Sequence, residues 1–222
     1  MPNSTNLFVI TTTLANKAIS EKRRNNLLNE FSQYDVPIIF NHGILKKSES
    51  QVVEIMYTII LKALQTFKRV DCEYALICDD DFFPIPNFME ELNATMDKLP
   101  EDWRSLHLCP GYLWGRAKRN ASKLGCLNPE GNIDAMEKDE SGRLFVNVDA
   151  KYCYNKFMWL GGPIAFIVNK KHIDNFIEEY TKIYKEFNLH NDRIFTKMLT
   201  KNDYICRIPM LGTEREEGGT TF

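Results

Sequence analysis

Short apolar runs alternate with helical patterns over the first 80 residues, and this alternation constrains the fold more than any other feature of the sequence. The runs Leu7–Thr12, Val36–Phe40 and Tyr74–Cys78 have the length and the β-branched content of strands. Ala15–Gln33 and residues 52–67, which lie between them, carry apolar side chains at helical spacing. Because a helix between two strands makes a parallel crossover, this order predicts an α/β domain with a mostly parallel central sheet flanked by helices.

Two finer expectations follow from the first half. The Tyr74–Cys78 run is uniformly apolar, which predicts a central strand, and Pro37 predicts that the Val36–Phe40 strand lies at an edge. In the first helix, we expect the charged residues, Arg23 and Arg24 among them, to face solvent and the larger apolar residues to face the core. These inward residues are Ile19, Leu27, Leu28 and Phe31.

The second half is less regular. It is predicted to contain a helix at Pro86–Leu99, strands at Ser105–Leu108, Arg143–Val148, Ile164–Val168 and Tyr204–Ile208, a long helix after Asn169 and a short helix at Arg193–Leu199. Residues 110–150 are rich in Gly, Asn, Asp and Lys, and their weak periodicity predicts a long loop, which in a compact domain is usually functional or mobile.

The charge balance excludes several classes of protein. There are 28 Lys and Arg residues against 30 Asp and Glu, a net charge of −2. The sequence therefore lacks the excess of basic residues that is typical of proteins that bind nucleic acid or an anionic membrane. No apolar run reaches the roughly 18 residues of a membrane span, and the polar start Met1–Asn6 lacks the order of a secretory signal. The six cysteines form no CxxC pair and are expected to be reduced. We therefore expect a protein without a membrane span that works in a cytoplasm.

Asp79, Asp80 and Asp81 follow directly after the predicted central strand. Carboxylates two residues apart on an extended chain share a face and lie about 7 Å apart. Two unit charges at this distance repel each other by about 2 kcal/mol at an effective dielectric constant of about 20. A hard divalent cation, Mn²⁺ or Mg²⁺, would relieve the repulsion and still bind phosphate oxygens. The alternative is a solvated acidic turn that caps the next helix; an EF-hand loop is disfavoured because Pro84 stands where it requires glycine.

Several segments together resemble the metal-dependent nucleotide-sugar glycosyltransferases of the GT-A fold. These segments are the first strand–helix repeats, Leu76–Leu92 (LICDDDFFPIPNFMEEL), Trp159–His172 and Leu189–Leu199. An Asp-x-Asp motif in this context is the signature of that family, and the whole chain resembles the amino-terminal domain of a large glycosyltransferase that chloroviruses encode. The resemblance implies one GT-A domain over residues 1–222, with residues 1–109 as the nucleotide-binding half and residues 110–222 as the acceptor-side half. It leaves open that the chain is a module of a longer protein.

The resemblance also implies roles for individual residues. Asp79 and Asp81 would bind the metal, with Asp79 and Asp80 in contact with the donor, and Asp192 would be the general base. The other donor-binding residues would be Thr11, Thr12, Thr13, Gly161 and Gly162. Each has a plainer alternative: the threonines can simply end a strand, the glycines can form a tight turn, and Asp192 can cap the Arg193–Leu199 helix.

Two further positions carry weaker expectations. Arg23 or Arg24 could reach a nucleotide, but a solvated helix face is favoured. His190 could contact a metal or a phosphate, but an ordinary exposed histidine is favoured.

The implied function is transfer of a sugar from a UDP-sugar, with UDP-glucose and UDP-rhamnose as candidates, to a glycan or glycoprotein acceptor. The cofactor would be Mn²⁺ or Mg²⁺, and with Asp192 as base the reaction would invert the anomeric configuration. The chlorovirus resemblance implies synthesis of a capsid glycan in the host cytoplasm. Two alternatives remain open: a nucleotidyltransferase, which would usually carry a Gly-rich phosphate loop that this sequence lacks, and a non-catalytic nucleotide- or carbohydrate-binding module.

Overall fold

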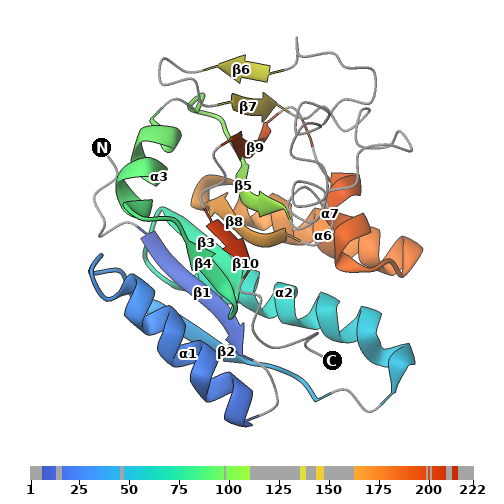
Figure 1. The fold of residues 1–222 in the computed structure, drawn as a ribbon. Coiled ribbons are helices and arrows are strands. Elements are labelled where there is room, and N and C mark those ends of the chain that lie inside the picture. Colours follow the sequence, from blue (N-terminus) through green and yellow to red (C-terminus); the bar gives the residue numbers. More distant parts are fainter. Residues whose placement is uncertain are drawn as a thin grey trace, which may run out of the picture.

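One mixed sheet organises the molecule (Figure 1). The computed structural model describes residues 7–13, 17–45, 48–97, 99–110, 136–138, 144–147, 163–198, 200, 202–208 and 212–214. Within these residues, eight strands form a sheet in the order β2-β1-β3-β8-β5-β9-β7-β6. They are β1 (Leu7–Thr13), β2 (Ile38–His42), β3 (Tyr74–Asp79), β5 (Ser105–Pro110), β6 (Met136–Lys138), β7 (Leu144–Asn147), β8 (Pro163–Asn169) and β9 (Asp203–Ile208).

Six of these eight strands share one direction, which confirms the predicted mostly parallel sheet. The pairs β1–β2, β1–β3 and β5–β9 are parallel. The strands β7 and β8 run the other way, so that their contacts with their neighbours are antiparallel. A separate two-stranded sheet, which the sequence pattern did not predict, joins β4 (Phe82–Pro84) to β10 (Gly212–Glu214).

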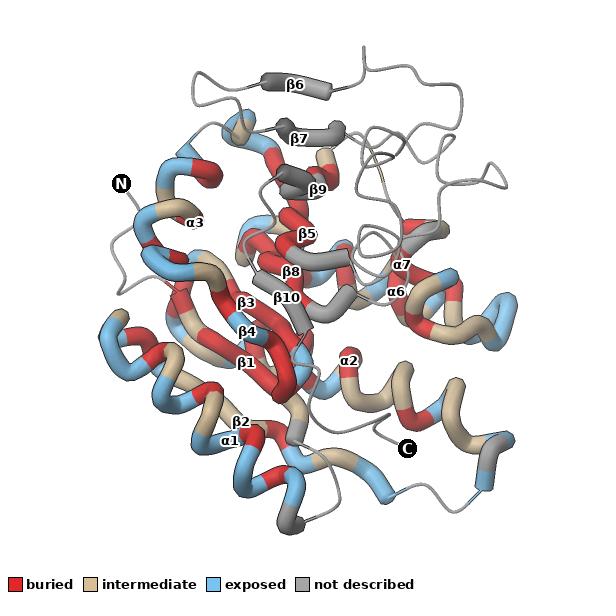
Figure 2. Tube along the Cα trace, in the orientation of Figure 1, coloured by how far each residue is buried: buried red, intermediate tan, exposed pale blue. Residues whose placement is uncertain are grey.

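Helices cover both faces of the sheet, and β1, β3 and the described parts of β5 and β8 are mostly buried between them (Figure 2). The described helices are α1 (Lys17–Phe31), α2 (Val52–Arg69), α3 (Phe88–Met96), α6 (Ile173–Phe187) and α7 (Asn191–Met198), with short 3-10 helices at Glu49–Gln51 and Lys170–His172. Along β3, Leu76 and Cys78 belong to the core shared with α1 and α3. Ala75 and Ile77 belong to the core shared with α2, α6 and α7. Among the described residues, no helix is both long enough and apolar enough to cross a membrane.

The inward face of α1 differs from the prediction. Leu27 and Phe31 are buried as expected, but Ile19 is 37% exposed and Leu28 is 41% exposed. The buried stripe instead contains Ser20, Arg23, Leu27 and Phe31, which are three or four residues apart. The prediction was wrong because it assigned inward positions by hydrophobicity, whereas helical phase places an arginine on the inward face.

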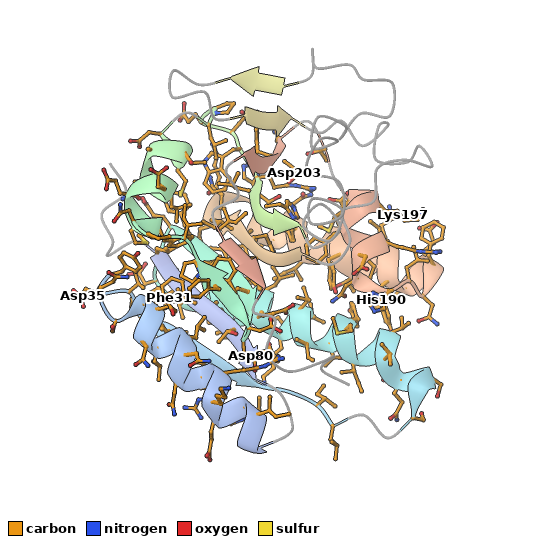
Figure 3. The ribbon with its side chains drawn as sticks, viewed as in Figure 1. Phe31, Asp35, Asp80, His190, Lys197 and Asp203 are labelled. Carbon is orange, nitrogen blue, oxygen red and sulfur yellow. The ribbon has the colours of Figure 1, made fainter. Side chains whose placement is uncertain are left out.

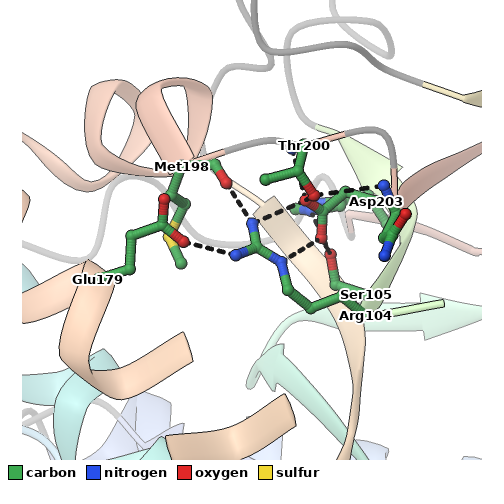
Figure 4. A network of polar contacts seen from close by, with 8 residues as sticks. Arg104, Ser105, Glu179, Met198, Thr200 and Asp203 are labelled. Carbon is green, nitrogen blue, oxygen red and sulfur yellow. Dashed lines mark hydrogen bonds and ion pairs between the residues drawn. The ribbon is translucent and has the colours of Figure 1, made fainter. Parts of the chain in front are cut away.

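A buried ion pair joins the second half of the sheet to its helices (Figure 4). Arg104, just before β5, donates to Asp203 of β9 from Nε at 3.0 Å and from Nη2 at 2.7 Å. It also contacts Glu179 of α6 and the backbone carbonyl of Met198 in α7. Burial disfavours the charged guanidinium, but hydrogen bonds and the charges of Asp203 and Glu179 outweigh it and raise the pKa of Arg104. The pair therefore connects two strands with two helices.

We predict that Arg104→Met lowers the free energy of unfolding by about 3–5 kcal/mol, because it leaves the fully buried Asp203 carboxylate without its counter-charge. Urea unfolding followed by circular dichroism measures this loss. The control is Arg69→Met, which removes an exposed arginine from the last turn of α2 and should change stability by about 0.5 kcal/mol or less. Equal effects of the two substitutions would contradict the role of the pair.

Candidate active site

The predicted threonines and aspartates lie side by side where β1 and β3 end. In the parallel register, Thr11 is opposite Cys78 and Thr12 is opposite Asp79. Ligands of open α/β sheets bind outside this carboxyl edge. The structure therefore brings together, at one edge, two segments that lie about 65 residues apart in the sequence.

The two threonines differ in orientation. Thr11 is 1% exposed. Burial and the charge of Asp79 raise the pKa of the Cys78 thiol, which lies opposite Thr11, well above its usual value. The Thr11 side chain thus lies inside the core, as a residue that simply ends a strand would. Thr12 is partly exposed, and strand alternation puts it on the face covered by α2, together with Asp79.

The three aspartates occupy different environments. Asp79, the last residue of β3, is exposed, whereas Asp80 and Asp81 form the turn into β4 and are only 3% and 6% exposed. The acidic run does not cap the next helix, because α3 begins after Asn87, beyond β4. That alternative interpretation of the run is therefore wrong.

Arg23 is the residue that the sequence analysis placed incorrectly. It is 5% exposed, and its Nη1 lies 2.9 Å from Oδ1 of Asp80 and 3.1 Å from Oδ2 of Asp81. Figure 3 shows Asp80 close to the end of β1, above α1. The prediction that Arg23 is solvated is wrong because its partners Asp80 and Asp81 lie 57 and 58 positions away, where no local pattern reveals them. The only signal in the sequence is its place on the Ser20, Leu27, Phe31 stripe.

The donor set suits a hard divalent cation that arrives with a ligand. The three carboxylates of the run and the Arg23 guanidinium, which pairs with Asp80 and Asp81, together carry a formal charge of −2. Among the described residues, no group of three or more His, Cys, Asp or Glu side chains forms a ready-made metal cage. Magnesium is typically held by one or two carboxylates and completed by water and substrate phosphates. The residues therefore fit Mn²⁺ or Mg²⁺ completed by a phosphate ligand.

Asp192 lies in the first turn of α7 and is paired with His190. The His190 Nδ1 and the Asp192 Oδ1 are 3.2 Å apart, and both side chains are partly exposed. The amides of Arg193 and Ile194 donate to the His190 carbonyl, so Asp192 is already within the helix and is not its cap. A hydrogen bond from His190 to Asp192 raises the pKa of His190, against the effect of burial.

Asn191 fixes the position of this pair. It is 2% exposed, accepts a hydrogen bond from the Tyr180 hydroxyl of α6 and donates from Nδ2 to the Met56 carbonyl of α2 at 3.2 Å. Because α2 follows β2, Met56 lies on the side of the sheet where β1, β2 and β3 end. Asp192 therefore lies on the same side as the acidic run, and on the face toward which Asp79 points.

A pocket that sequence reasoning missed opens beside this edge. It has a volume of about 370 Å³ and lies between the segment after β2 and the first half of α2. Its lining residues are Ile44, Leu45, Gln51, Glu54, Ile55 and Thr58. The exposed Ile44-Leu45 pair is the one feature of the sequence that could have indicated it.

The remaining predicted site residues are not placed by the structure. Gly161 and Gly162 lie outside the described residues, and so does the side chain of Thr13. Most of residues 110–150 also lie outside them, apart from β6, β7 and Pro110.

We predict that Asp192→Asn lowers the pKa of His190, because the substitution removes the hydrogen-bonded negative charge and leaves the effect of burial. NMR titration of the histidine ring protons measures the change. His172 is the internal control, since its pKa is lowered mainly by burial and Asp192 is not among the groups that shift it. A His190 titration that does not respond to the substitution would mean that the pair does not form in solution.

Comparison with known proteins identifies the fold. No family model matches this sequence, and no curated protein matches it. A solved glycosyltransferase involved in the glycosylation of the major capsid of PBCV-1 is similar with a TM-score of 0.55 and 10% identity, over 97% of this chain and 94% of that chain. A mutant Drosophila β-1,4-galactosyltransferase 7 in complex with manganese, UDP-Gal and xylobiose has a TM-score of 0.41 and 11% identity, over 98% of this chain and 68% of that chain, too weak a similarity to support an inference. The first match shows that this chain has the α/β GT-A fold seen in glycosyltransferase structures, as the sequence predicted.

Proposed function

We propose that this protein is a metal-dependent glycosyltransferase that moves a sugar from a UDP-sugar to a hydroxyl group of a glycan or glycoprotein. The observation that carries the proposal is the acidic run at the carboxyl end of β3, in register with Thr12 of β1, in a chain with the GT-A fold. Nucleotide ligands of open α/β sheets bind at this edge. The involvement of the similar PBCV-1 enzyme in glycosylation of the major capsid supports a glycan or glycoprotein acceptor. UDP-glucose and UDP-rhamnose are the donors that we propose to test first.

On the donor side, Asp79 and Asp81 are proposed to hold Mn²⁺ or Mg²⁺, with Asp80 close to the donor. The cation, when bound, would stabilise the negative charge that develops on the departing diphosphate. Asp79 suits this role because it is exposed and points to the same face as Thr12. Thr12 is proposed to hydrogen bond with the ribose or the uracil, whereas the side chain of Thr11 is buried in the core.

On the acceptor side, Asp192 is proposed as the general base. Its carboxylate would take the proton of the acceptor hydroxyl while that oxygen attacks the anomeric carbon opposite the diphosphate, which inverts the configuration. The contact with His190 orients the carboxylate, and Asn191 holds the start of α7 against α2. The location of Asp192 and Asp79 on one side of the sheet supports this division of roles.

A non-catalytic nucleotide- or carbohydrate-binding module is the second candidate. The observation that favours it is the contact of Arg23 with both Asp80 and Asp81, because a guanidinium can balance these carboxylates in a protein that has no need of a metal. Release of UDP separates the two candidates, since a module binds a nucleotide sugar without turnover.

We predict that the protein releases UDP from a UDP-sugar in the presence of Mn²⁺ and that Asp81→Asn abolishes both this release and metal-dependent binding of UDP. Asp192→Asn should lower transfer on the order of 10²–10⁴-fold, as expected for loss of a general base, and leave UDP binding intact. A coupled assay for free UDP and calorimetric titration with UDP measure these effects. Asp71→Asn, an exposed substitution just before β3 and far from the carboxyl edge, is the control. Binding of several UDP-sugars without any turnover would support the module instead.

We also predict that Mn²⁺ and UDP bind cooperatively, because the protein carboxylates alone leave the coordination shell incomplete. UDP should increase the affinity for Mn²⁺ about 5–150-fold, and Mn²⁺ should increase the affinity for UDP by the same factor. Titrations of each ligand with and without the other give both factors. Equal affinity for Mn²⁺ in the presence and absence of UDP would contradict a shared site.

A further inference from the structure

The Arg23 guanidinium lies buried between two carboxylates of the acidic run, a position that a metal cation could also occupy. A single nitrogen, Nη1, bridges one oxygen of Asp80 and one oxygen of Asp81, and each of the three side chains is less than 10% exposed. Charged groups buried to this degree are strongly unfavourable unless they are paired. The arrangement therefore differs from a solvent-exposed ion pair, which contributes little and forms with many geometries.

The ion pair of Arg23 with Asp80 and Asp81 differs in its location from an ion pair that only stabilises the fold. It reaches from the inward face of α1 to the turn that follows β3, and it engages two carboxylates of the acidic run while Asp79 remains exposed. One of the engaged oxygens belongs to Asp81, the residue proposed as a metal ligand. The guanidinium and a divalent cation would then have to share one carboxylate, with two positive groups as close neighbours.

We propose that Arg23 is a positioning residue that neutralises part of the acidic run and thereby makes binding of the divalent cation depend on the diphosphate. In the protein alone, the guanidinium opposes the cation by its like charge and by engaging oxygens of Asp80 and Asp81. The negative charge of a diphosphate would compensate both the Arg23 guanidinium and the divalent cation. The cation and the nucleotide would therefore bind cooperatively. This inference rests on the proposed function, because it assumes that the cation and the nucleotide share this edge.

The test is the affinity for Mn²⁺ alone, measured by electron paramagnetic resonance of free Mn²⁺ and by calorimetry. Arg23→Gln should bind Mn²⁺ alone about tenfold more tightly than the wild type. Its coupling between Mn²⁺ and UDP should be about tenfold smaller, because only the part that comes from phosphate ligation of the cation remains. Arg23→Lys retains the charge and should keep the low affinity for Mn²⁺ alone. Arg24→Gln is the matched control on the same helix, because Arg24 is exposed and stacks on Phe40, and it should leave the affinity unchanged.

The Arg23→Gln variant leaves two buried carboxylates without their partner and can therefore fail to fold. The double variant Arg23→Gln with Asp80→Asn removes one of those charges and keeps Asp79 and Asp81, so it should fold. Its reference is Asp80→Asn alone, which keeps the guanidinium. The double variant should bind Mn²⁺ alone more tightly than this reference, because only the positive charge of Arg23 differs between them. The inference is overturned if the wild type shows coupling between Mn²⁺ and UDP and the folded variants retain it unchanged. Absence of Mn²⁺ and UDP binding in the wild type would instead refute the proposed function.

Discussion

Burial of two carboxylates at the end of β3 is the interaction on which the candidate site depends. Asp80 and Asp81 are nearly inaccessible to water and would be strongly unfavourable without a positive partner. Arg23 supplies that partner from α1, which in turn requires α1 to present an arginine on the stripe that otherwise carries Leu27 and Phe31. The same ion pair therefore determines both the position of α1 on the sheet and the conformation of the turn that holds Asp80 and Asp81.

The antiparallel course of β8 decides what lies opposite the acidic run. Because β8 runs against β3, the following helix α6 returns toward the edge where β1, β2 and β3 end. Two contacts hold this returning segment against α2. Lys170 donates to the carbonyls of Phe67 and Val70 at the end of α2, at 2.6 and 2.7 Å, and Asn191 donates to Met56 near its start. These contacts place His190 and Asp192 on the same side of the sheet as the candidate metal ligands.

Much of the fold could be predicted from the sequence, and the failures have a common cause. The strands at Leu7, Tyr74 and Ile164 were predictable because buried strands are uniformly apolar, and the long helices because their apolar spacing is regular. The inward face of α1 was not predictable from hydrophobicity, since Arg23 replaces an apolar residue there for an electrostatic reason. The start of α7 was predicted two residues late because Asn191 and Asp192 were read as residues before a helix, whereas Asn191 is anchored by Tyr180 and Met56.

By itself, the sequence determined the order of strands and helices, the central position of β3 and the run of acids at its end, because each depends on the chemistry of neighbouring residues. Only the tertiary structure decided that Arg23 is the positive group paired with those acids, and that Asp79 and Asp192 lie on the same face of the sheet. The physical reason is that charge compensation in a protein interior acts between groups brought together through space. Arg23 lies 57 residues from its partner Asp80, and Met56 lies 135 residues from its partner Asn191, so that no periodicity of the sequence connects them.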